Sequence, residues 1–398
     1  MIPYGRQSIS EADIAAVEEV LRSDFLTQGQ AIPRFEKAVS HYCGAEHGVA
    51  VNSATSALHI ACLALGVGPG DLVWTSATTF VASANCARYC GAEVDFVDID
   101  PTTFNMSVEA LEGKLLEAET EGRLPKVVIP VHMCGQSADM REIGALAERY
   151  GFRVIEDASH AIGGSYRNRN VGACEFSDIC VFSFHPVKIV TTGEGGLATT
   201  NNPDFAQKMQ LLRSHGVTRQ PKLLSAENPP PWYYEQIDLG FNYRMTDIQA
   251  ALGTSQIERL NEFVDKRHAI ADRYDDMLGD LPVVMPRRLS NRRSALHLYV
   301  IRLETHKIEP SHRDVFEALR AGGIGVNLHY MPVYLQPDFR KLGFEPGLCP
   351  EAEKYANDAI SIPMYPALGE DDQREVVEVL TRILSHGDGS GSEVEHQT

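Results

Sequence analysis

The sequence predicts an α/β fold with a mostly parallel central sheet, followed by a smaller C-terminal α+β domain. Short apolar segments that resemble strands alternate with helical segments over the first half of the chain, as in strands joined by right-handed helical crossovers. The hydrophobic period then changes after one long helical segment. With 398 residues and 43% hydrophobic content, the chain can form one large core and one smaller core.

Two helices are predicted before the first strand. Residues 10–13 resemble a capping box with Asp13 in the fourth position, and Pro33 lies in the first turn of the second helix, where proline is favoured. The predicted strands that follow cover residues 48–51, 72–75, 94–99, 127–131, 153–156, 179–184 and 196–200. The predicted helices between them include residues 54–65, 80–89 and 139–150.

The second half of the chain is predicted to contain a separate unit. A loop rich in proline and aromatic residues covers 227–235, and a long helix from about residue 246 to 267 leads into the smaller domain. There the sequence predicts strands over 297–303 and 324–330 and helices over 313–321 and 370–384. We therefore expect a large domain with an N-terminal arm over 1–250 and a small domain over 251–386. Residues 387–398 are polar and rich in Gly and Ser, which predicts a disordered tail.

Composition excludes several classes of function. The formal net charge of −18 argues against binding to nucleic-acid phosphates as the main task. The eight cysteines contain no Cys-x-x-Cys pair, which favours reduced thiols in a cytoplasmic protein over a disulfide framework or a metal site. The N-terminus lacks a basic segment followed by an apolar run, and no uncharged apolar run reaches about 18 residues. We therefore expect a cytoplasmic protein with no nucleic-acid partner, no membrane partner and no metal.

Lys188 is the first candidate catalytic residue. It lies between an apolar strand and the Gly-rich turn 193–196. An apolar setting lowers the pKa of a lysine and leaves a nucleophilic amine that can bond covalently to an aldehyde. Taken alone, a lysine that extends from a strand end toward solvent would be the commoner explanation.

Asp157 is the second candidate. It follows the apolar segment 152–155 at the carboxyl end of a predicted strand, where open α/β sheets bind ligands. Taken alone, Asp157 could also cap the segment that follows it. Together, Lys188 and Asp157 meet the two needs of a pyridoxal 5'-phosphate (PLP) site. The lysine holds the aldehyde, and the carboxylate keeps the pyridine nitrogen protonated so that the ring accepts electrons.

A phosphate site is predicted where residues 51–56 leave a strand and open a helix. The unpaired N–H groups of a helix N-terminus and the hydroxyls of Ser53 and Thr55 could hold a phosphate there, although such residues also cap helices for structural reasons alone. Phe80 follows another predicted strand and could stack on a cofactor ring. A place in the ordinary core is the alternative for Phe80.

Several motifs that include these residues resemble those of the DegT/DnrJ/EryC1/StrS family of sugar-nucleotide aminotransferases, which has PLP fold type I. The resemblance extends from Tyr4 to about Leu384. It implies that PLP is bound covalently to Lys188, that Asp157 pairs with the pyridine nitrogen and that Phe80 stacks on the ring. The motifs that carry it are residues 52–55, 77–80, 156–160, 183–188, 192–196, 213–216 and 240–249.

The resemblance also implies how the phosphate is held and how the subunits assemble. Ala54, Thr55 and Ser183 would contact the phosphate, and Asn242 would reach it from a neighbouring subunit. A homodimer with shared active sites follows from that role. The residues alone leave open that Asn242 and Arg244 are a loop cap and a surface charge.

Within the family, residues 25–29, 233–240, 297–300 and 325–336 resemble the aminotransferase of the pseudaminic acid pathway. This resemblance implies transfer of an amino group from L-glutamate to C4 of UDP-2-acetamido-2,6-dideoxy-β-L-arabino-hex-4-ulose (EC 2.6.1.92). Because both substrates are anions, Arg6, Arg219 and Arg244 are candidate donors to them, although each taken alone is more commonly explained as a surface residue. The residues that it implies for the sugar and nucleotide pocket are Tyr4, Phe25, Leu26, Thr27, Gln28, His185, Asn327, Leu328, His329 and Tyr330.

Other functions remain open at this level. The keto sugar could carry dTDP or GDP, or be aminated at C3. A non-catalytic regulator could keep the fold, although the intact Lys188 and Asp157 pair argues against one. Some relatives carry histidine in place of the lysine and perform dehydration, whereas this chain carries Lys188. A dinucleotide-binding fold is disfavoured because the Gly-rich segment 66–70 follows a helix and precedes a strand.

Overall fold

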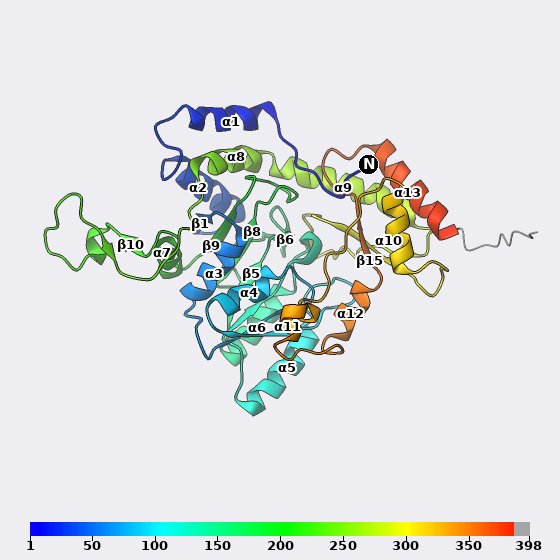
Figure 1. The fold of residues 1–398 in the computed structure, drawn as a ribbon, viewed down its shortest axis with the longest axis horizontal. Coiled ribbons are helices and arrows are strands. Elements are labelled where there is room, and N and C mark those ends of the chain that lie inside the picture. Colours follow the sequence, from blue (N-terminus) through cyan, green and yellow to red (C-terminus); the bar gives the residue numbers. More distant parts are fainter. Residues whose placement is uncertain (386–398) are drawn as a thin grey trace, which may run out of the picture.

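The computed structural model describes residues 1–385 of the protein, and its larger part is built around a seven-stranded sheet (Figure 1). The strands are β1 (His47–Val51), β2 (Leu72–Ser76), β3 (Glu93–Val97), β4 (Val127–Ile129), β5 (Arg153–Asp157), β8 (Ile179–Ser183) and β9 (Gly196–Thr200). They lie in the order β1-β9-β8-β5-β4-β2-β3. Neighbours from β8 to β3 pair in parallel, and β9 is antiparallel to both β1 and β8. The predicted mostly parallel sheet is confirmed.

Helices cover both faces of this sheet. They are α1 (Glu11–Leu21), α2 (Ala31–Cys43), α3 (Ala54–Ala64), α4 (Ala82–Tyr89), α5 (Val108–Glu121), α6 (Met140–Tyr150), α7 (Pro203–Leu212) and α8 (Asp247–Glu258). Side chains alternate along β8, so that Ile179 and Val181 join the core formed with α3, α4 and α7, whereas Cys180 and Phe182 join the core formed with α2 and α8. The expected capping box of α1 is present between Ser10 and Asp13.

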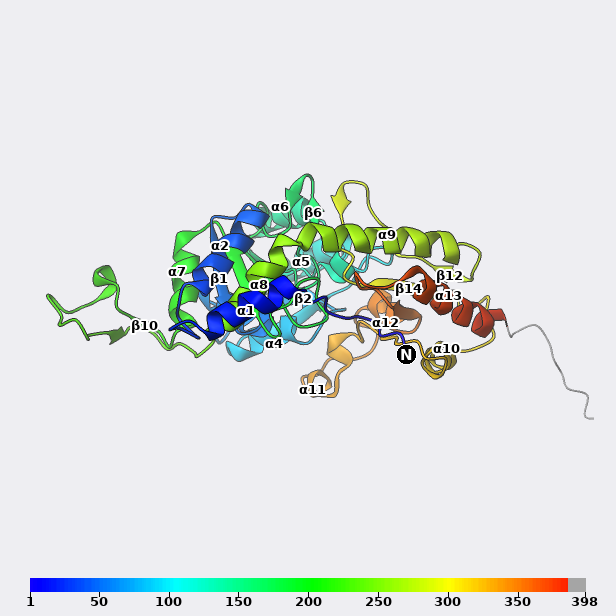
Figure 2. The same ribbon diagram turned by 90° about the horizontal axis from the view of Figure 1, so that it is seen from above.

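Short elements connect these layers. They are a 3-10 turn η1 (Met133–Gly135), β6 (Ser165–Tyr166), β7 (Arg169–Asn170), β10 (Val217–Thr218), η2 (Pro221–Leu223), β11 (Glu235–Gln236) and β13 (Arg292–Arg293). β13, β6 and β7 form a three-stranded sheet. The loop between β10 and β11 contains the Pro-rich segment 227–235, and both views show this region extending away from the body of the protein (Figures 1 and 2).

The long helix predicted over 246–267 is two helices, α8 and α9 (Leu260–Leu278). They meet at Arg259, whose backbone angles of φ −102° and ψ 6° break the helical hydrogen-bond pattern. The first half of α9, including Phe263, packs on the core of α2 and α8, and the second half, including Tyr274, packs on the core of the C-terminal part. α9 therefore connects the two parts of the molecule, as the figures also show (Figures 1 and 2).

The C-terminal part contains a second, smaller antiparallel sheet in the order β12-β14-β15. Its elements are β12 (Val283–Val284), β14 (Tyr299–Leu303), α10 (His312–Ala321), η3 (Val333–Leu335), α11 (Pro337–Arg340), α12 (Pro350–Ala356), β15 (Ala359–Ile362) and α13 (Glu370–Ser385). The expected strand over 324–330 is not formed, because this segment makes only single bridges, Ile324 with Ile2 and Asn327 with Ser361. Ile2 thereby joins the core of this part. The tail predicted over 387–398 lies outside the described residues.

Two predictions from composition concern the cysteines and membrane spans. All eight cysteines lie in the described part of the chain, where they are buried and free of disulfide bonds. This agrees with the expectation of reduced, packed thiols. Within residues 1–385, no helix combines the length and the apolar character that a bilayer crossing requires.

Candidate active site

A cavity of about 890 Å³ lies beside the carboxyl ends of β5 and β8. It contains Lys188 and Asp157, which are far apart in the sequence. The parallel pairing of β5 with β8 explains this, because it brings the two strand ends to the same edge of the sheet. The predicted site residues that line the cavity are Tyr4, Ala54, Thr55, Phe80, Asp157, Ser183, His185, Lys188, Asn327, Leu328, His329 and Tyr330.

Lys188 lies in the turn between β8 and β9. Its backbone N–H donates to the carbonyl of His185 at 2.9 Å, and the turn is closed by Thr192 N–H donating to Phe184 O at 3.0 Å. Desolvation lowers the pKa of Lys188 to about 8, and the Asp157 carboxylate partly opposes this shift. The amine is therefore neutral in a substantial fraction of molecules near pH 8, which is the form that attacks a carbonyl carbon.

Asp157 is 4% exposed at the end of β5. Its backbone N–H donates to Pro130 O at 2.9 Å, and its carbonyl accepts from His132 N–H at 3.0 Å. Its carboxylate accepts from Ser159 N–H at 3.1 Å and from Ser83 Oγ at 2.6 Å. The carboxylate is therefore held in one orientation within the cavity wall.

The N-terminus of α3 forms one end of the cavity. Ser53 is the N-cap of α3, and its hydroxyl accepts from Ser56 N–H at 3.1 Å. Ala54 and Thr55 line the cavity with the first turn of the helix, whose N–H groups have no partners within the helix. Gly196 of β9 packs so closely here that a Cβ would lie 2.4 Å from Ser53 C and 2.5 Å from Ala54 N. The site thus has a helix N-terminus that could hold an anion.

Replacing Gly196 by alanine is expected to push β9 away from the first turn of α3. We expect a loss of stability of about 1–3 kcal/mol from overpacking, together with at least about tenfold weaker binding of PLP. Thermal unfolding and a PLP titration measure the two effects. Gly68→Ala is the matched control, since a Cβ at Gly68 meets nothing within 4 Å. Equal melting temperature and PLP affinity in the two variants would contradict the prediction.

Phe80 is 58% exposed, which rules out a place in the ordinary core. Its ring lines the cavity, with its centroid 6.1 Å from that of Tyr330. An exposed phenyl ring on a cavity wall is suited to cover the face of a flat ligand.

Three histidines surround Lys188 from other elements: His160, His297 and His329. Desolvation, together with the nearby Lys188, lowers the pKa of all three, so these rings are neutral. The rings of His160 and His297 lie 4.5 Å apart between centroids, and His160 Nε2 lies 3.2 Å from the Tyr330 hydroxyl. Within the described residues the Nδ1 atoms of His160 and His297 are buried without a partner, which leaves them available to a ligand.

Five predicted site residues do not line this cavity of the same chain: Phe25, Leu26, Thr27, Gln28 and Asn242. Asn242 is exposed, and its backbone carbonyl lies 3.5 Å from Asn52 Nδ2. Gln28 lines a separate hollow of about 750 Å³ together with Arg219 and Arg244. Arg6 is exposed on the N-terminal arm and lines neither hollow.

Asp247 fixes the loop that contains Phe25 to Gln28. This buried carboxylate accepts from Gly29 N–H and from Ala31 N–H, both at 2.8 Å, and Asp247 N–H donates to Leu26 O at 3.0 Å. Two positions further along α8, Gln249 lines the main cavity and donates to Glu194 O at 2.7 Å. The start of α8 therefore holds both the loop and one wall of the cavity.

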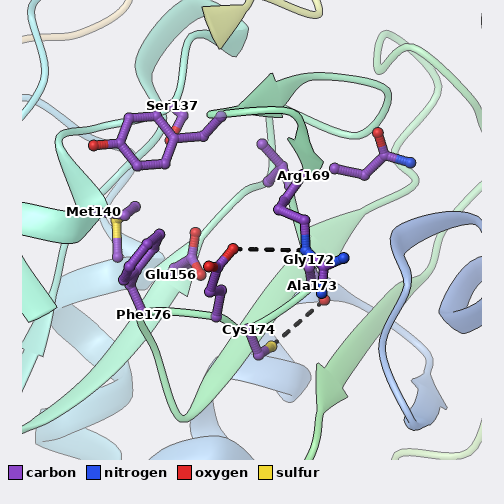
Figure 3. A pocket seen from close by; sticks show the side chains of 12 residues that line it. Ser137, Met140, Glu156, Arg169, Gly172, Ala173, Cys174 and Phe176 are labelled. Atoms are coloured by element: carbon purple, nitrogen blue, oxygen red, sulfur yellow. Dashed lines mark hydrogen bonds and ion pairs between the residues drawn. The ribbon is translucent and has the colours of Figure 1, made fainter. Parts of the chain in front are cut away.

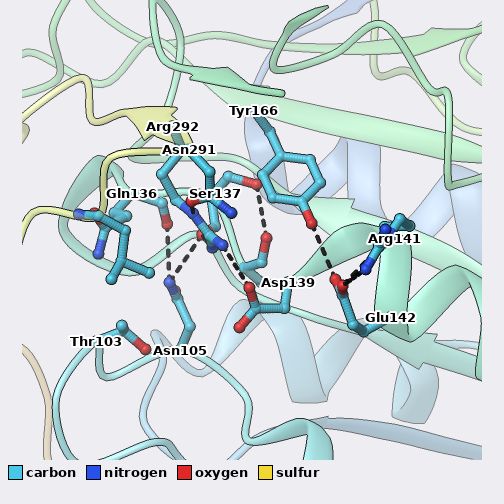
Figure 4. Close-up of polar contacts among 12 residues, drawn as sticks. Thr103, Asn105, Gln136, Ser137, Asp139, Arg141, Glu142, Tyr166, Asn291 and Arg292 are labelled. Atoms are coloured by element: carbon cyan, nitrogen blue, oxygen red, sulfur yellow. Dashed lines mark hydrogen bonds and ion pairs between the residues drawn. The ribbon is translucent and has the colours of Figure 1, made fainter. Parts of the chain in front are cut away.

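A polar network around Ser137 connects Arg292 with the loop after β4 (Figure 4). Arg292 Nη1 donates to Ser137 O at 2.7 Å, and Asn105 Nδ2 donates to the same carbonyl at 3.2 Å. Beside this network, Ala295 N–H donates to Gly135 O at 2.9 Å, which joins the start of the C-terminal part to the loop after β4. A Cβ at Gly135 would lie 2.9 Å from His160 O and 3.0 Å from His297 N, so only glycine permits this approach.

A second, much smaller cavity lies on the opposite face of β5 (Figure 3). Its volume is about 20 Å³, enough for about one water molecule, and Glu156 and Cys174 line it. Glu156 Oε2 lies 2.6 Å from His132 Nε2, and its other oxygen accepts from the Ser177 hydroxyl. Because side chains alternate along β5, Glu156 and Asp157 face opposite sides, and this cavity is separate from the candidate active site.

Some residues of the site were missed by sequence reasoning. Ser83 contacts the Asp157 carboxylate from helix α4. No motif in the sequence of α4 distinguishes Ser83 from other serines near the start of a helix. His160 lies three positions after Asp157, and His297 lies two positions before β14, so a pattern in the sequence could have pointed to both. His160 is a polar residue close to a strand end, and His297 is a histidine in an otherwise apolar segment.

The residues present fit PLP. The α3 N-terminus is suited to the phosphate, Phe80 to one face of the ring, Asp157 to the ring nitrogen and Lys188 to the aldehyde. The unpartnered Nδ1 atoms of His160 and His297 are consistent with a polar ligand between these walls.

Comparison with known proteins finds relatives over nearly the whole chain. The model of the DegT/DnrJ/EryC1/StrS aminotransferase family matches residues 7–381. The spore coat polysaccharide biosynthesis protein SpsC of Bacillus subtilis is 36% identical over 97% of this chain and 98% of its own. The UDP-4-amino-4,6-dideoxy-N-acetyl-beta-L-altrosamine transaminase of Campylobacter jejuni is 37% identical over 96% of this chain and 98% of its own. GDP-perosamine synthase of Caulobacter vibrioides is 38% identical over 89% of this chain and 91% of its own.

Solved structures share the fold. Helicobacter pylori PseC, an aminotransferase involved in the biosynthesis of pseudoaminic acid, superposes with a TM-score of 0.88 at 29% identity, covering 97% of this chain and 99% of that one. A Streptococcus pneumoniae protein solved in its PLP form gives a TM-score of 0.86 at 29% identity, covering 96% of this chain and all of that one. These structures confirm the predicted fold.

Proposed function

Because the chain belongs to the DegT/DnrJ/EryC1/StrS aminotransferase family, we propose that it transfers the amino group of L-glutamate to C4 of a nucleotide-linked 4-keto-6-deoxy sugar. The observation that carries this proposal is that Lys188, with a pKa near 8, and the buried Asp157 line one cavity. The family, together with the PLP form of a structural relative, implies PLP as the cofactor. Covalent attachment at Lys188 is part of the proposal.

When bound, PLP supplies a ring that takes up the electron pair released at the carbon that bears the nitrogen. Asp157 would hold a proton on the ring nitrogen, and a buried carboxylate with a fixed orientation is suited to this task. Lys188 would hold the aldehyde and, once displaced by the amino donor, would accept and return a proton at Nζ. Its pKa of about 8 lies near neutrality, where an acid–base group works best.

The neighbouring side chains would bind and orient the reactants. The neutral rings of His160, His297 and His329 add no positive charge beside Lys188, so they do not lower its pKa further. Tyr4 and the segment Asn327 to Tyr330 line the same cavity as the α3 N-terminus and are the proposed sugar contacts. Ala54, Thr55 and Ser183 are the proposed phosphate contacts, and His185 is a proposed substrate contact at the rim.

We propose UDP-2-acetamido-2,6-dideoxy-β-L-arabino-hex-4-ulose as the sugar substrate. The similarity to a relative named UDP-4-amino-4,6-dideoxy-N-acetyl-beta-L-altrosamine transaminase supports this choice. A GDP-linked keto sugar is the second candidate, supported by the comparable similarity to GDP-perosamine synthase. The similarity to SpsC supports a role of the product in polysaccharide biosynthesis.

A homodimer with shared active sites is also proposed. Asn242 is exposed beside Asn52, a cavity residue, and Phe25 is 62% exposed in the loop fixed by Asp247. An exposed phenylalanine and an exposed hollow with Arg219 and Arg244 favour a partner subunit whose cavity these groups complete. Light scattering measures the mass, and a monomer would contradict this part of the proposal.

The substrate proposal predicts the position of the transferred nitrogen. The PLP-loaded protein is incubated with ¹⁵N-labelled L-glutamate and either the UDP-linked or a GDP-linked 4-keto sugar, and the product is analysed by NMR. We expect ¹⁵N on C4 of the UDP-linked sugar, at a kcat/KM at least about tenfold above that of the GDP-linked sugar, because the nucleotide contacts discriminate between them. A reversed preference would support the second candidate. Absence of transfer to any keto sugar, despite loaded PLP, would refute the aminotransferase proposal.

A further inference from the structure

We propose that Ser83 is a positioning residue that holds the Asp157 carboxylate in its ionised, ring-facing state through a directed hydrogen-bond chain from Thr79. The inference rests on the proposed function, because it concerns how Asp157 would serve the cofactor ring. Ser83 is the second residue of α4, and its side chain is fully buried. Its contact with Asp157 joins α4 to the end of β5 directly at the cavity wall.

The direction of the chain follows from a count of protons. Ser83 Oγ lies 2.6 Å from Asp157 Oδ2 and 2.9 Å from Thr79 Oγ1. An ionised carboxylate has only acceptor positions, so the single hydroxyl proton of Ser83 must point to Asp157. Thr79 must then donate to Ser83 Oγ, which gives the sequence Thr79 to Ser83 to Asp157. The carbonyl of Phe80, at 3.4 Å, is a poorer acceptor for the Ser83 proton.

The contact of 2.6 Å between Ser83 Oγ and Asp157 Oδ2 is short for a hydroxyl donor. Hydroxyl donors approach carboxylates to about 2.5–2.7 Å when the acceptor is charged, and to longer distances when both groups are neutral. A donor to the charged form favours that form over the protonated one. With Ser159 N–H on Oδ1 and Ser83 on Oδ2, each oxygen has one fixed donor and keeps one free lone pair. The remaining acceptor capacity is what a ring N–H needs.

The same turn also carries Phe80. Thr79 and Ser83 flank Phe80, which lines the cavity, and Ser83 N–H donates to Phe80 O at 3.3 Å. Residues 79–83 would therefore place the ring-covering phenyl group and the donor to Asp157 as one unit. A shift of this turn would disturb both contacts, whereas removal of the Ser83 hydroxyl alone would disturb only the second.

Loss of the Ser83 hydroxyl would change the pH at which protons leave the ring nitrogen of the bound cofactor and the nitrogen of Lys188. Without Ser83, the ion pair between Asp157 and a protonated ring nitrogen is less favoured, so the ring carries less positive charge. In the PLP-loaded protein, the pH at which the nitrogen of Lys188 gives up its proton would then rise. The other titratable groups that line the cavity are Tyr4, His160, His185, Glu194, His297, His329 and Tyr330. Burial lowers the pKa values of His160, His297 and His329 and raises that of Tyr330.

The test is a pH titration of the absorbance of the PLP-loaded protein, for the wild type, Ser83→Ala and Ser83→Thr. We expect the midpoint of Ser83→Ala to rise by about 0.5–1 pH unit, and that of Ser83→Thr, which keeps a hydroxyl, to stay near the wild-type value. The kcat of Ser83→Ala should fall about tenfold, with the KM values for both substrates within about twofold, because the hydroxyl acts on the ring and not on substrate binding.

Thr78→Val is the matched control from the same turn. Thr78 is fully buried, and within the described residues its hydroxyl has no hydrogen-bond partner, so its loss should leave the midpoint and kcat unchanged. An unshifted midpoint in Ser83→Ala, or a shift equal to that of Thr78→Val, would overturn the role of Ser83. A wild-type protein that forms no absorbing complex with PLP would instead refute the proposed function, so the two failures are distinguishable.

Discussion

Replacing Lys188 by alanine is expected to abolish amino transfer, with kcat reduced on the order of 10⁴-fold or more. The reason is that one amine would serve as both the covalent anchor and the proton carrier, and removal of a group with two roles affects both. Lys188→Arg keeps a positive charge but remains protonated, so it should be equally inactive. Steady-state amino transfer from glutamate measures the loss. Activity within tenfold of the wild type in either variant would contradict the assigned role.

The covalent anchor can be tested separately from turnover. Treating the PLP-loaded wild-type protein with borohydride should fix the cofactor to the chain, and the peptide that contains Lys188 should gain the corresponding mass. Lys188→Ala should show no such gain. A gain on another lysine of the wild-type protein would place the anchor elsewhere in the chain.

The pH dependence of attachment follows from the pKa of Lys188. The neutral amine reacts with an aldehyde, and desolvation lowers the pKa of Lys188 from its usual value to about 8. The rate of covalent attachment should therefore rise about tenfold per pH unit below pH 8 and level off above it. An exposed lysine would keep rising to about pH 10.

The sequence predicted the sheet and the pair of catalytic candidates for a shared physical reason. Each buried strand is a short apolar run between helical segments, and this pattern is local. Lys188 and Asp157 follow two such runs, and parallel pairing of β5 with β8 then brings them to the same edge. Knowledge of the sheet class was enough to place both residues in one cavity.

Other features depend on contacts that a local pattern does not contain. No glycine or proline lies next to Arg259, so the break between α8 and α9 was not predictable. Ser83 and Asp157 meet across 74 positions of sequence. The loop with Phe25 to Gln28 lies away from the cavity of its own chain because Asp247, from α8, fixes it there. The family resemblance implied that Phe25 to Gln28 line a substrate pocket, but it did not show whether that pocket belongs to the same subunit or to a partner.

Asp157→Asn is expected to lower kcat about 10³-fold while leaving covalent attachment at Lys188 intact. Asparagine keeps the shape: its single oxygen can accept from Ser159 N–H, and its Nδ2 can donate to Ser83 Oγ in place of the carboxylate oxygen that accepts there. It carries no charge to hold a proton on the ring nitrogen. The absorbance midpoint should shift in the same direction as in Ser83→Ala and further, because the whole ion pair is lost instead of one supporting hydrogen bond.

The measurement for Asp157→Asn is a single-turnover reaction with glutamate, followed by absorbance, together with the borohydride assay. Asp157→Glu is the control for charge, since it restores a carboxylate one methylene further along and should recover part of the rate. A rate within about threefold of the wild type in Asp157→Asn would show that the ring works without this carboxylate. Loss of the borohydride adduct would show instead that Asp157 acts on attachment. We expect slow turnover together with an intact borohydride adduct in Asp157→Asn. The slow turnover would show that Asp157 helps the ring to withdraw electrons, and the intact adduct would show that Lys188 anchors the cofactor without it.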